Sequence, residues 1–303
     1  MLEMWRGVLK MKVKLIDILQ KTQEQLLDYT VCRLEERGYA RKITKTKDYV
    51  FAQGNIPVLL VAHLDTVHKQ LPEVYYDREK EVLWSPQGIG GDDRCGVYAI
   101  LKICEHCNPY VLFTTDEEIG SKGAEKFVKE IDEKTMKKIN FMIEIDRRGY
   151  NEAVFYDCGN EDFKNMILSY GFEEEFGSFS DISVLSPAFD IASVNLSAGY
   201  FNEHTTNEII RIDYLMHTLY NIEKILLSKD VNTKYDFQEE FNSYYSYLYG
   251  DNYGKNGYSS LRTLIEDDWE NVSDDEWFDY YGEEKPKTKE ELNDFILNFN
   301  GFN

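Results

Sequence analysis

The sequence predicts an α/β protein in which helices cover both faces of a central β-sheet. From residue 13 to about residue 232, short apolar runs alternate with segments whose apolar residues have helical spacing. The apolar runs are continuous, and this is typical of strands that are buried on both faces. The chain has 303 residues, of which 43% are hydrophobic, so it can bury a sizeable core. Together these observations predict a three-layer αβα sandwich.

Each layer can be assigned to segments of the chain. The expected strands span residues 49–52, 58–62, 111–114, 141–145, 153–156 and 192–196. The expected helices span residues 13–37, 93–105, 122–131, 162–170 and 213–227. Gly38 follows the first helix, as glycine commonly does at a helix C-terminus.

The composition changes after residue 232. Residues 234–303 contain 17 acidic and 6 basic residues, a net charge of −11, and they are rich in tyrosine. We therefore expect a globular domain over residues 1–232 and an acidic, tyrosine-rich C-terminal appendage over residues 233–303. The appendage is expected to be partly helical or partly disordered. In the alternative interpretation, its tyrosines anchor a partner or cover an active site.

Charge and cysteine usage exclude several classes of protein. The formal net charge of −21 repels nucleic-acid phosphates and anionic lipid, so neither is an expected partner. The sequence contains no run of eighteen apolar residues, so it predicts no membrane span. The first ten residues do not resemble a signal peptide. The five cysteines are an odd, scattered set, which indicates reduced thiols and a cytoplasmic protein.

Residues of the types that bind metal ions follow the expected strands. On a strand, positions two apart point the same way, so His63 and Asp65 can face one pocket. In open α/β sheets, ligands bind at the edge where such strands end. Five groups of this kind follow a strand end or occupy a connecting loop: His63 and Asp65; Asp92 and Asp93; Asp116, Glu117 and Glu118; Glu144 and Asp146; and Glu203, His204 and Glu208.

The joint placement of these groups is more informative than any one of them. A single His-x-Asp or pair of glutamates is more often structural, for example at a helix N-terminus. Several carboxylates at one rim repel each other unless cations neutralise them. Imidazole and carboxylate ligands without thiolate fit Zn²⁺, Mn²⁺ or Co²⁺ at a hydrolytic site. The sequence therefore predicts two divalent metal ions, with zinc the first choice.

The five groups resemble, in the same order, the motifs of the co-catalytic zinc metallopeptidases of clan MH. That superfamily includes peptidase T, the aminoacylase and carboxypeptidase group, and the di-zinc aminopeptidases. The resemblance covers about residues 55–210 and implies a zinc-peptidase (phosphorylase/hydrolase-like) fold with a mostly parallel, mixed sheet. It is carried by His63-Leu-Asp65, Gly91-Asp92-Asp93-Arg94, Thr115-Asp-Glu117-Glu118-Ile-Gly, and Gly199…His204…Glu208.

The resemblance also implies the metal ligands. One metal ion would be bound by His63 and Asp146, the other by Glu118 and His204, and Asp92 would bridge the two. Two alternatives stay open. Asp93 is either a supporting residue or, by a shift of one position, the bridge itself. Glu144 competes with Asp146, because both lie on one side of their strand.

Two further roles follow from the same resemblance. Glu117 would be the general base that activates the attacking water. Asp65 would accept the free ring N–H of His63 and so orient that ligand. The loop Ser178-Phe-Ser-Asp181 resembles a Ser-Asp element near the substrate pocket of these enzymes.

The spacing departs from many members of the superfamily. About 28 residues separate His63 from Asp92 and about 57 separate Asp146 from His204. Neither interval has room for the lid or dimerisation domain that many relatives insert there. The sequence therefore predicts a catalytic domain without a lid.

Other possible ligands are interpreted as structural. Cys104 and Cys107 resemble half of a zinc ribbon, but no second pair completes it. His68 and His217 have no ligand-type neighbours in the sequence.

The leading function is a metal-dependent exopeptidase, aminopeptidase-like, that acts on a peptide. One alternative is a deacylase of N-acyl amino acids that uses the same site. A second is a non-catalytic binding module of the same fold, although such a module would be expected to lose the base or a ligand. The sequence does not give the oligomeric state.

Overall fold

The computed structural model describes residues 13–39, 41–177, 179–239, 269, 285–289 and 291. The chain divides into two units, Met1–Glu240 and Phe241–Asn303. Almost all of the expected C-terminal appendage therefore lies outside the described residues, and its character stays a prediction. No helix in the described part is long and apolar enough to cross a membrane.

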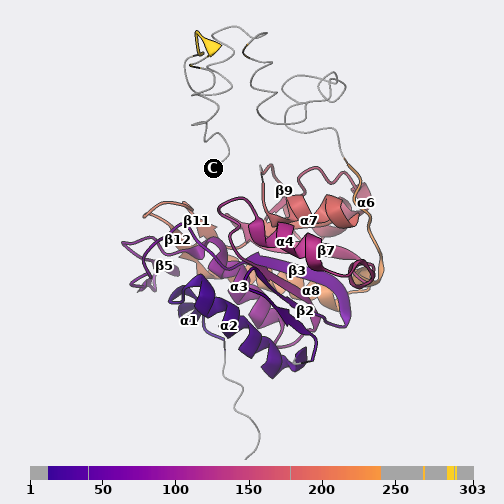
Figure 1. Cartoon of the computed structure of the whole chain (residues 1–303). Coiled ribbons are helices and arrows are strands. Elements are labelled where there is room, and N and C mark those ends of the chain that lie inside the picture. Colours follow the sequence, from indigo (N-terminus) through magenta and orange to yellow (C-terminus); the bar gives the residue numbers. More distant parts are fainter. Residues whose placement is uncertain are drawn as a thin grey trace, which may run out of the picture. The chain divides into compact units, whose positions relative to one another are not determined.

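The first unit contains a large mixed β-sheet (Figure 1). Its strands lie in the order β1-β2-β6-β3-β7-β10-β8-β9. The central strands β6, β3, β7 and β10 are parallel to one another. Strands β1 and β2 pair antiparallel with their neighbours, and β8 pairs antiparallel with β10 and parallel with β9. The bounds are β1 Ile43–Lys45, β2 Tyr49–Ala52, β3 Ile56–His63, β6 Pro109–Thr114, β7 Phe141–Arg147, β8 Glu152–Val154, β9 Glu173–Glu174 and β10 Ser193–Ser197.

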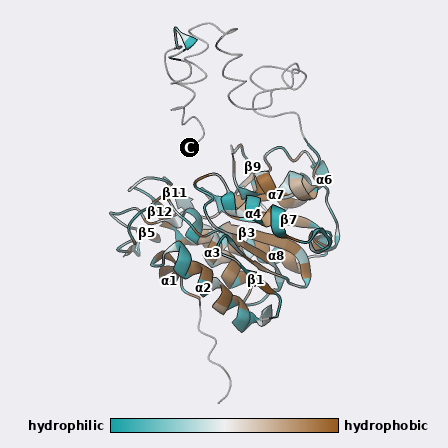
Figure 2. Cartoon of the chain, in the orientation of Figure 1, coloured by the Kyte–Doolittle hydropathy of each residue, from teal (hydrophilic) through white to brown (hydrophobic). Residues whose placement is uncertain are grey.

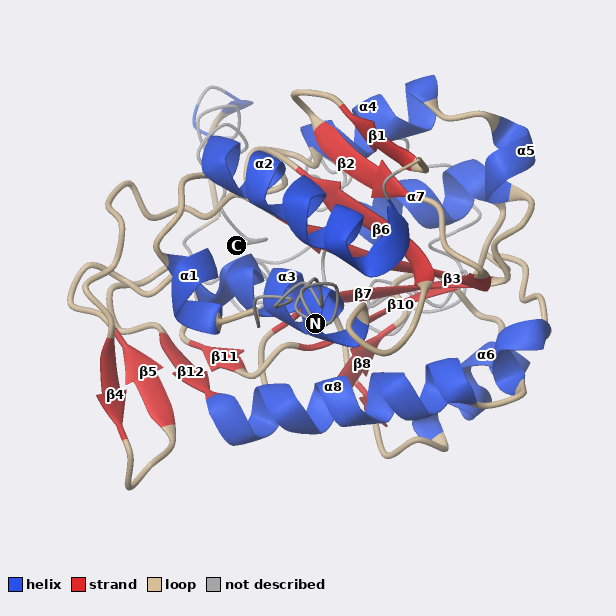
Figure 3. Ribbon diagram, turned by 90° about the horizontal axis from the view of Figure 1, so that it is seen from below, coloured by secondary structure: helices blue, strands red, loops and turns tan. Residues whose placement is uncertain are grey.

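Helices cover both faces of this sheet, which confirms the three-layer prediction (Figure 3). One face of the sheet packs against α3 and α8, and α1 and α2 lie beside α3. The other face packs against α4 and α7. The bounds are α1 Leu15–Leu19, α2 Gln23–Leu34, α3 Gly91–Ile103, α4 Lys122–Glu130, α5 Glu133–Met136, α6 Glu161–Leu168, α7 Asp181–Phe189 and α8 Ile212–Leu227, with single turns at Glu35–Tyr39 and Asp230–Asn232.

The central strand β3 shows why its apolar run is continuous. Val58, Leu60 and Ala62 belong to the core on the α3 side, and Leu59 and Val61 to the core on the α4 side. All five side chains are fully buried, and the strand is hydrophobic in Figure 2. Because successive side chains point to opposite faces, a strand between two helical layers needs an apolar residue at every position.

The first expected helix is interrupted. Residues 13–37 form α1 and α2, separated at Gln20–Thr22, instead of one helix. Thr22 starts α2 with a capping box: its side chain accepts from the Gln25 N–H, and the Gln25 side chain accepts from the Thr22 N–H. This reciprocal pair satisfies two backbone donors and fixes a new helix start.

Two features do not follow from the apolar pattern. Helix α7 lies between the expected elements and contains Pro187. A second, four-stranded antiparallel sheet has the order β11-β12-β5-β4. Its strands are β4 Tyr75–Asp77, β5 Val82–Trp84, β11 Tyr200–Phe201 and β12 Ile209–Arg211.

Replacing Phe127 with alanine is expected to lower the free energy of unfolding by about 3–5 kcal/mol. Phe127 is fully buried on α4 and contacts the rings of Tyr49, Phe51 and Phe189 at centroid distances of 5.2, 5.1 and 6.0 Å. Denaturant unfolding of both proteins measures the difference. The exposed neighbour variant Lys126→Ala should change stability by less than about 0.5 kcal/mol. Equal effects of the two substitutions would contradict the packing described for this face.

Candidate metal centre

The sheet brings the strand ends together. Strands β6, β3 and β7 are neighbours and run parallel, so their carboxyl ends meet at one edge. His63 ends β3 and pairs in register with Thr114 at the end of β6. Asp146 lies at the end of β7, and Asp92 lies in the first turn of α3. The topology therefore places three of the predicted groups at the same rim.

His63 lies at the centre of this rim and is 1% exposed. Its Nε2 lies 3.0 Å from Asp92 Oδ1 and 3.3 Å from Asp146 Oδ1. Its Nδ1 lies 3.2 Å from Asp65 Oδ1. One ring nitrogen thus faces two carboxylates, and the other is held from behind by a third. This is the arrangement of a metal-binding imidazole whose second nitrogen is fixed by a carboxylate.

His204 completes the rim from the loop between β11 and β12. Its Nε2 lies 3.2 Å from Asp92 Oδ2 and 3.0 Å from Glu118 Oε2. Asp92 therefore directs one oxygen toward His63 and the other toward His204. A carboxylate between two imidazoles in this way has the position of a bridging ligand.

The residues of the rim fit divalent cations. Two groups have ligand atoms that all lie within 4.8 Å of one another: His63, Asp92 and Glu118, and His63, Asp93 and Asp146. The Glu118 Oε1 atom is buried and has no hydrogen-bond partner. A buried carboxylate oxygen without a donor is costly, and a cation would satisfy it.

The pKa values show the same crowding of carboxylates. Burial and, in smaller measure, carboxylates such as Asp146 raise the pKa of Glu117 to about 9, although His63 opposes the shift. Burial also raises the pKa of Asp93 well above its usual value. Hydrogen bonds to Asp92 and Glu118 raise the pKa of His204 to about 11. A divalent cation in the cluster would offset the repulsion between these carboxylates and favour their ionised forms.

The adjacent acids Asp92 and Asp93 have different surroundings. Asp93 is fully buried, and its carboxylate accepts from the backbone N–H of Gly96 at 2.9 Å and of His63 at 3.2 Å. A Cβ atom on Gly96 would lie 2.1 Å from the Ile145 carbonyl oxygen, so α3 packs here directly on β7. Asp93 is therefore engaged with the backbone at the start of α3, whereas Asp92 faces the histidines.

Glu144 and Asp146 also differ. Glu144 is fully buried and accepts from the Ser180 hydroxyl. Asp146 Oδ1 accepts from the Tyr200 hydroxyl at 3.1 Å, and its Oδ2 accepts from Ser180 Oγ at 3.1 Å. The Asp146 backbone N–H donates to Asn195 Oδ1 at 2.8 Å. Of the two acids, only Asp146 lies within 3.3 Å of His63 Nε2.

Asp65 connects His63 to the glutamate loop. Besides the His63 ring, its carboxylate accepts from the backbone N–H groups of Glu117 and Glu118, each at 3.1 Å. Burial raises the pKa of Asp65, but these hydrogen bonds outweigh it and lower the pKa below the usual value. Asp65 therefore orients a candidate ligand and the loop that carries the candidate base.

Replacing Asp65 with asparagine is expected to weaken metal binding or turnover by about 10–100-fold. Both oxygens of the Asp65 carboxylate now accept from N–H groups. In asparagine an NH₂ group replaces one of these oxygens and cannot accept a hydrogen bond. Metal titration and steady-state kinetics measure the effect. Asp190→Asn is the matched control, because Asp190 is an exposed helix C-cap with φ 56°, a conformation that asparagine tolerates. If the two variants behave alike, Asp65 does not have this role.

Glu208 holds the backbone around Asp92, a role that the sequence pattern did not indicate. It is 1% exposed, and its two oxygens accept from the backbone N–H groups of Asp92 at 3.0 Å and Gly90 at 2.9 Å. His68 Nε2 lies 2.7 Å from Glu208 Oε2. His68 has no ligand-type neighbour in the sequence, but the fold brings it beside Glu208, 140 positions away.

Asp181 is a second supporting acid. It starts α7, is fully buried, and accepts from the Thr114 hydroxyl at the end of β6. Its Oδ1 has no hydrogen-bond partner. The preceding residue, Ser180, donates from its hydroxyl to Asp146 Oδ2 at 3.1 Å, so this Ser-Asp element lies beside the rim.

Comparison with known proteins gives one family match. Residues 49–166 match the model of peptidase family M28. No curated protein matches the sequence.

Several solved structures have a similar fold. Aminopeptidase PepT from Bacillus cereus is 12% identical with a TM-score of 0.59, over 72% of this chain and 97% of that chain. A tripeptidase from Staphylococcus aureus is 15% identical with a TM-score of 0.54, over 72% and 96%. A Zn-dependent exopeptidase from Parabacteroides distasonis is 14% identical with a TM-score of 0.51, over 71% and 96%. At these identities the likeness is one of fold.

Proposed function

We propose that this chain belongs to the superfamily of co-catalytic zinc peptidases and is a metal-dependent exopeptidase with aminopeptidase-like activity. The observation that carries this proposal is the position of Asp92. Its two oxygens lie 3.0 Å from the Nε2 of His63 and 3.2 Å from the Nε2 of His204. A carboxylate shared by two histidines suits a pair of divalent cations.

Two ligand sets share this carboxylate. His63 and Asp146 would hold one metal ion, Glu118 and His204 the other, and Asp92 would bridge them. The backbone contacts of Asp93 support Asp92 as the bridge. Zinc is the favoured ion, because imidazole and carboxylate are its usual ligands at catalytic sites, and manganese and cobalt are the alternatives.

When bound, the metal ions would supply Lewis acidity toward the scissile carbonyl and the attacking water. Glu117 is the proposed general base. Among the described residues no group donates a hydrogen bond to its carboxylate, while its backbone N–H is held by Asp65 at 3.1 Å. The carboxylate is therefore fixed in place yet available to take a proton from water and pass it to the leaving amine.

The proposed substrate is a peptide, cleaved at a chain end. The words aminopeptidase, tripeptidase and exopeptidase in the descriptions of proteins with this fold support that choice. A deacylase of N-acyl amino acids would use the same residues for the same chemistry. A non-catalytic binding module is disfavoured, because the base and all five proposed ligands are present.

The cysteines support a cytoplasmic location. All five are free, and Cys95, Cys104, Cys107 and Cys158 are buried as thiols in the core. Thiols that stay unpaired are typical of a reducing compartment.

The test is an activity assay on the full-length protein with known metal content. We expect about two zinc ions per chain and release of N-terminal residues from a panel of aminoacyl, dipeptide and tripeptide substrates. Removing the metal with a chelator should abolish this activity, and Zn²⁺, Mn²⁺ or Co²⁺ should restore it. Cleavage of N-acyl amino acids alone would favour the deacylase. Folded protein that binds no metal and stays inactive with every ion would refute the proposal.

A further inference from the structure

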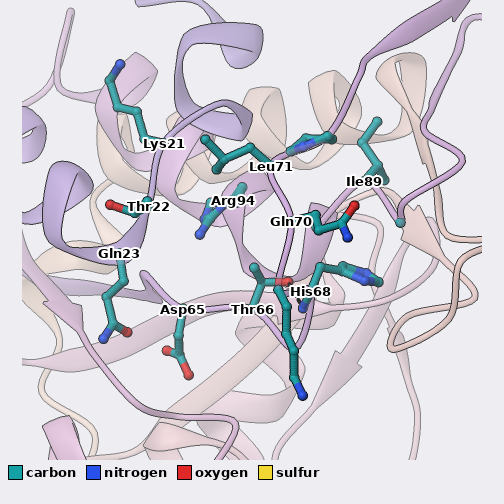
Figure 4. Close-up of a pocket in the computed structure, with 14 residues that line it drawn as sticks. Lys21, Thr22, Gln23, Asp65, Thr66, His68, Gln70, Leu71, Ile89 and Arg94 are labelled. Carbon is teal, nitrogen blue, oxygen red and sulfur yellow. Dashed lines mark hydrogen bonds between the residues drawn. The ribbon is translucent and has the colours of Figure 1, made fainter.

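A pocket lies beside the start of α2, with Asp65 in its lining (Figure 4). It has a volume of about 310 Å³ and is formed by the start of α2, residues 65–72 and residues 88–94. None of the five proposed metal ligands lines it. Asp65 borders it, but its carboxylate is already engaged by the His63 ring and by two backbone N–H groups.

Three basic side chains line this pocket: Lys21, Lys69 and Arg94. This is unusual in a chain with a net charge of −21. Within the described part of the chain, no carboxylate forms an ion pair with any of the three, and Asp65 is the one acid in the pocket lining. The pocket lining therefore carries three basic side chains and one acidic side chain.

Arg94 is the most constrained of these cations. It is 3% exposed, and its Nε and Nη2 both donate to the Leu64 carbonyl oxygen at 3.2 Å. No acceptor among the described residues contacts its Nη1. No carboxylate of the described residues forms a direct ion pair with this guanidinium, so an anion in the pocket could form a charge-assisted hydrogen bond with it.

The start of helix α2 adds neutral donors to the same pocket. Thr22 and Gln23 line it as the N-cap and first residue of a 12-residue helix. The first amides of a helix have no acceptor within the helix, and the helix dipole favours negative charge there. The hydroxyl of Thr66 also belongs to the lining. The pocket thus combines a buried guanidinium, two lysines and helix-end donors.

We propose that this pocket binds a small ligand through a carboxylate or phosphate group. Its volume is at the lower end for small-molecule sites, which suits a ligand about the size of an amino acid or a small phosphate ester. The guanidinium of arginine can donate two hydrogen bonds side by side to a carboxylate or phosphate, and the ammonium of lysine adds a positive charge. The proposal does not depend on the peptidase reaction, because it concerns binding alone.

The pocket also adjoins the supports of the glutamate loop. The Gln23 side chain donates to Asp116 Oδ1 at 3.0 Å and accepts from the Asp116 N–H at 3.2 Å. Asp65 holds the next two residues of that loop. An anion in the pocket would therefore lie against both elements that position Glu117.

Isothermal titration of the zinc-loaded, full-length protein with inorganic phosphate and, separately, with succinate tests the proposal. The double variant Lys21→Ala/Lys69→Ala should bind the preferred anion about tenfold more weakly. This loss of affinity is the size expected when two partly exposed charge contacts are removed. Lys129→Ala/Lys137→Ala is the control. It removes the same charge from exposed positions on α4 and at the C-cap of α5 and should leave the affinity within about twofold.

The outcomes separate the possible sites. Saturable binding of phosphate, succinate or both that weakens only in the Lys21/Lys69 variant supports the pocket, and the preferred anion identifies its chemistry. Binding that is unchanged in both variants would assign the anion to the metal ions and overturn the proposal. Absence of binding to either anion would overturn it too. Matching thermal unfolding of the two double variants shows that lost binding does not reflect lost folding.

Discussion

Replacing Glu117 with glutamine is expected to lower kcat by about 10³-fold while both metal ions stay bound. Positioned general bases contribute about 10²–10⁴-fold to turnover, and glutamine keeps the shape of the side chain without its basicity. The Glu117 carboxylate receives no hydrogen bond from the described residues, so the substitution breaks no internal contact of that group. Steady-state kinetics and metal analysis on the same preparation measure both quantities.

The matched control is Glu125→Gln, which removes one carboxylate from the exposed face of α4. It should leave kcat within about twofold, because a surface ion pair of this kind contributes little. If Glu117→Gln retains full turnover, Glu117 is not the base. If it loses metal instead, the side chain acts as a ligand.

Replacing His204 with alanine is expected to remove one metal ion and reduce turnover to background. His204 is the one imidazole in the ligand set proposed for this metal ion, and its Nε2 lies 3.0 Å from Glu118 Oε2. Its loss would leave that position with carboxylates only, a set that suits Mg²⁺ or Ca²⁺ better than Zn²⁺. Metal analysis after dialysis should give about one zinc ion per chain.

His106→Ala provides the comparison for this variant. His106 is exposed at the end of α3, outside the rim, so its removal should leave two metal ions and normal turnover. If His204→Ala keeps both ions, the second ligand set is wrong.

The layers of the fold were predictable because burial on both faces leaves a direct mark on the sequence. All six expected strands occur, and β3 shows the cause: each of Val58 to Ala62 is buried on one face or the other. The second sheet was missed because its strands have two or three residues and pair segments far apart in the chain, such as Trp84 with Ile209. Such short strands have no periodicity to detect.

Helix α7 was missed for a different reason. Its nine residues include two serines and Pro187, which weaken a helical pattern. Packing against α4 and β10 stabilises it in the fold. The serine at its N-cap, Ser180, has a partner three residues later in Ser183, which is a weak signal for a helix start.

The rim could be located from the sequence, but the roles of adjacent acids could not. Asp92 and Asp93 differ by one position, and only the backbone shows which faces the histidines. One signal was available: Asp93 precedes Gly96 by three residues, and its side chain accepts from the Gly96 N–H, the pattern of a helix N-cap. Glu208 gave no comparable signal, because its partners Gly90 and Asp92 lie more than a hundred residues away.

An anomalous-difference map at the zinc absorption edge, from crystals of the zinc-loaded protein, tests the central claim most directly. We expect two peaks about 3.5–4 Å apart, one beside His63 and Asp146 and the other beside Glu118 and His204, with Asp92 between them. A single peak, two peaks bridged by Asp93, or zinc bound elsewhere in the chain would contradict the proposed centre.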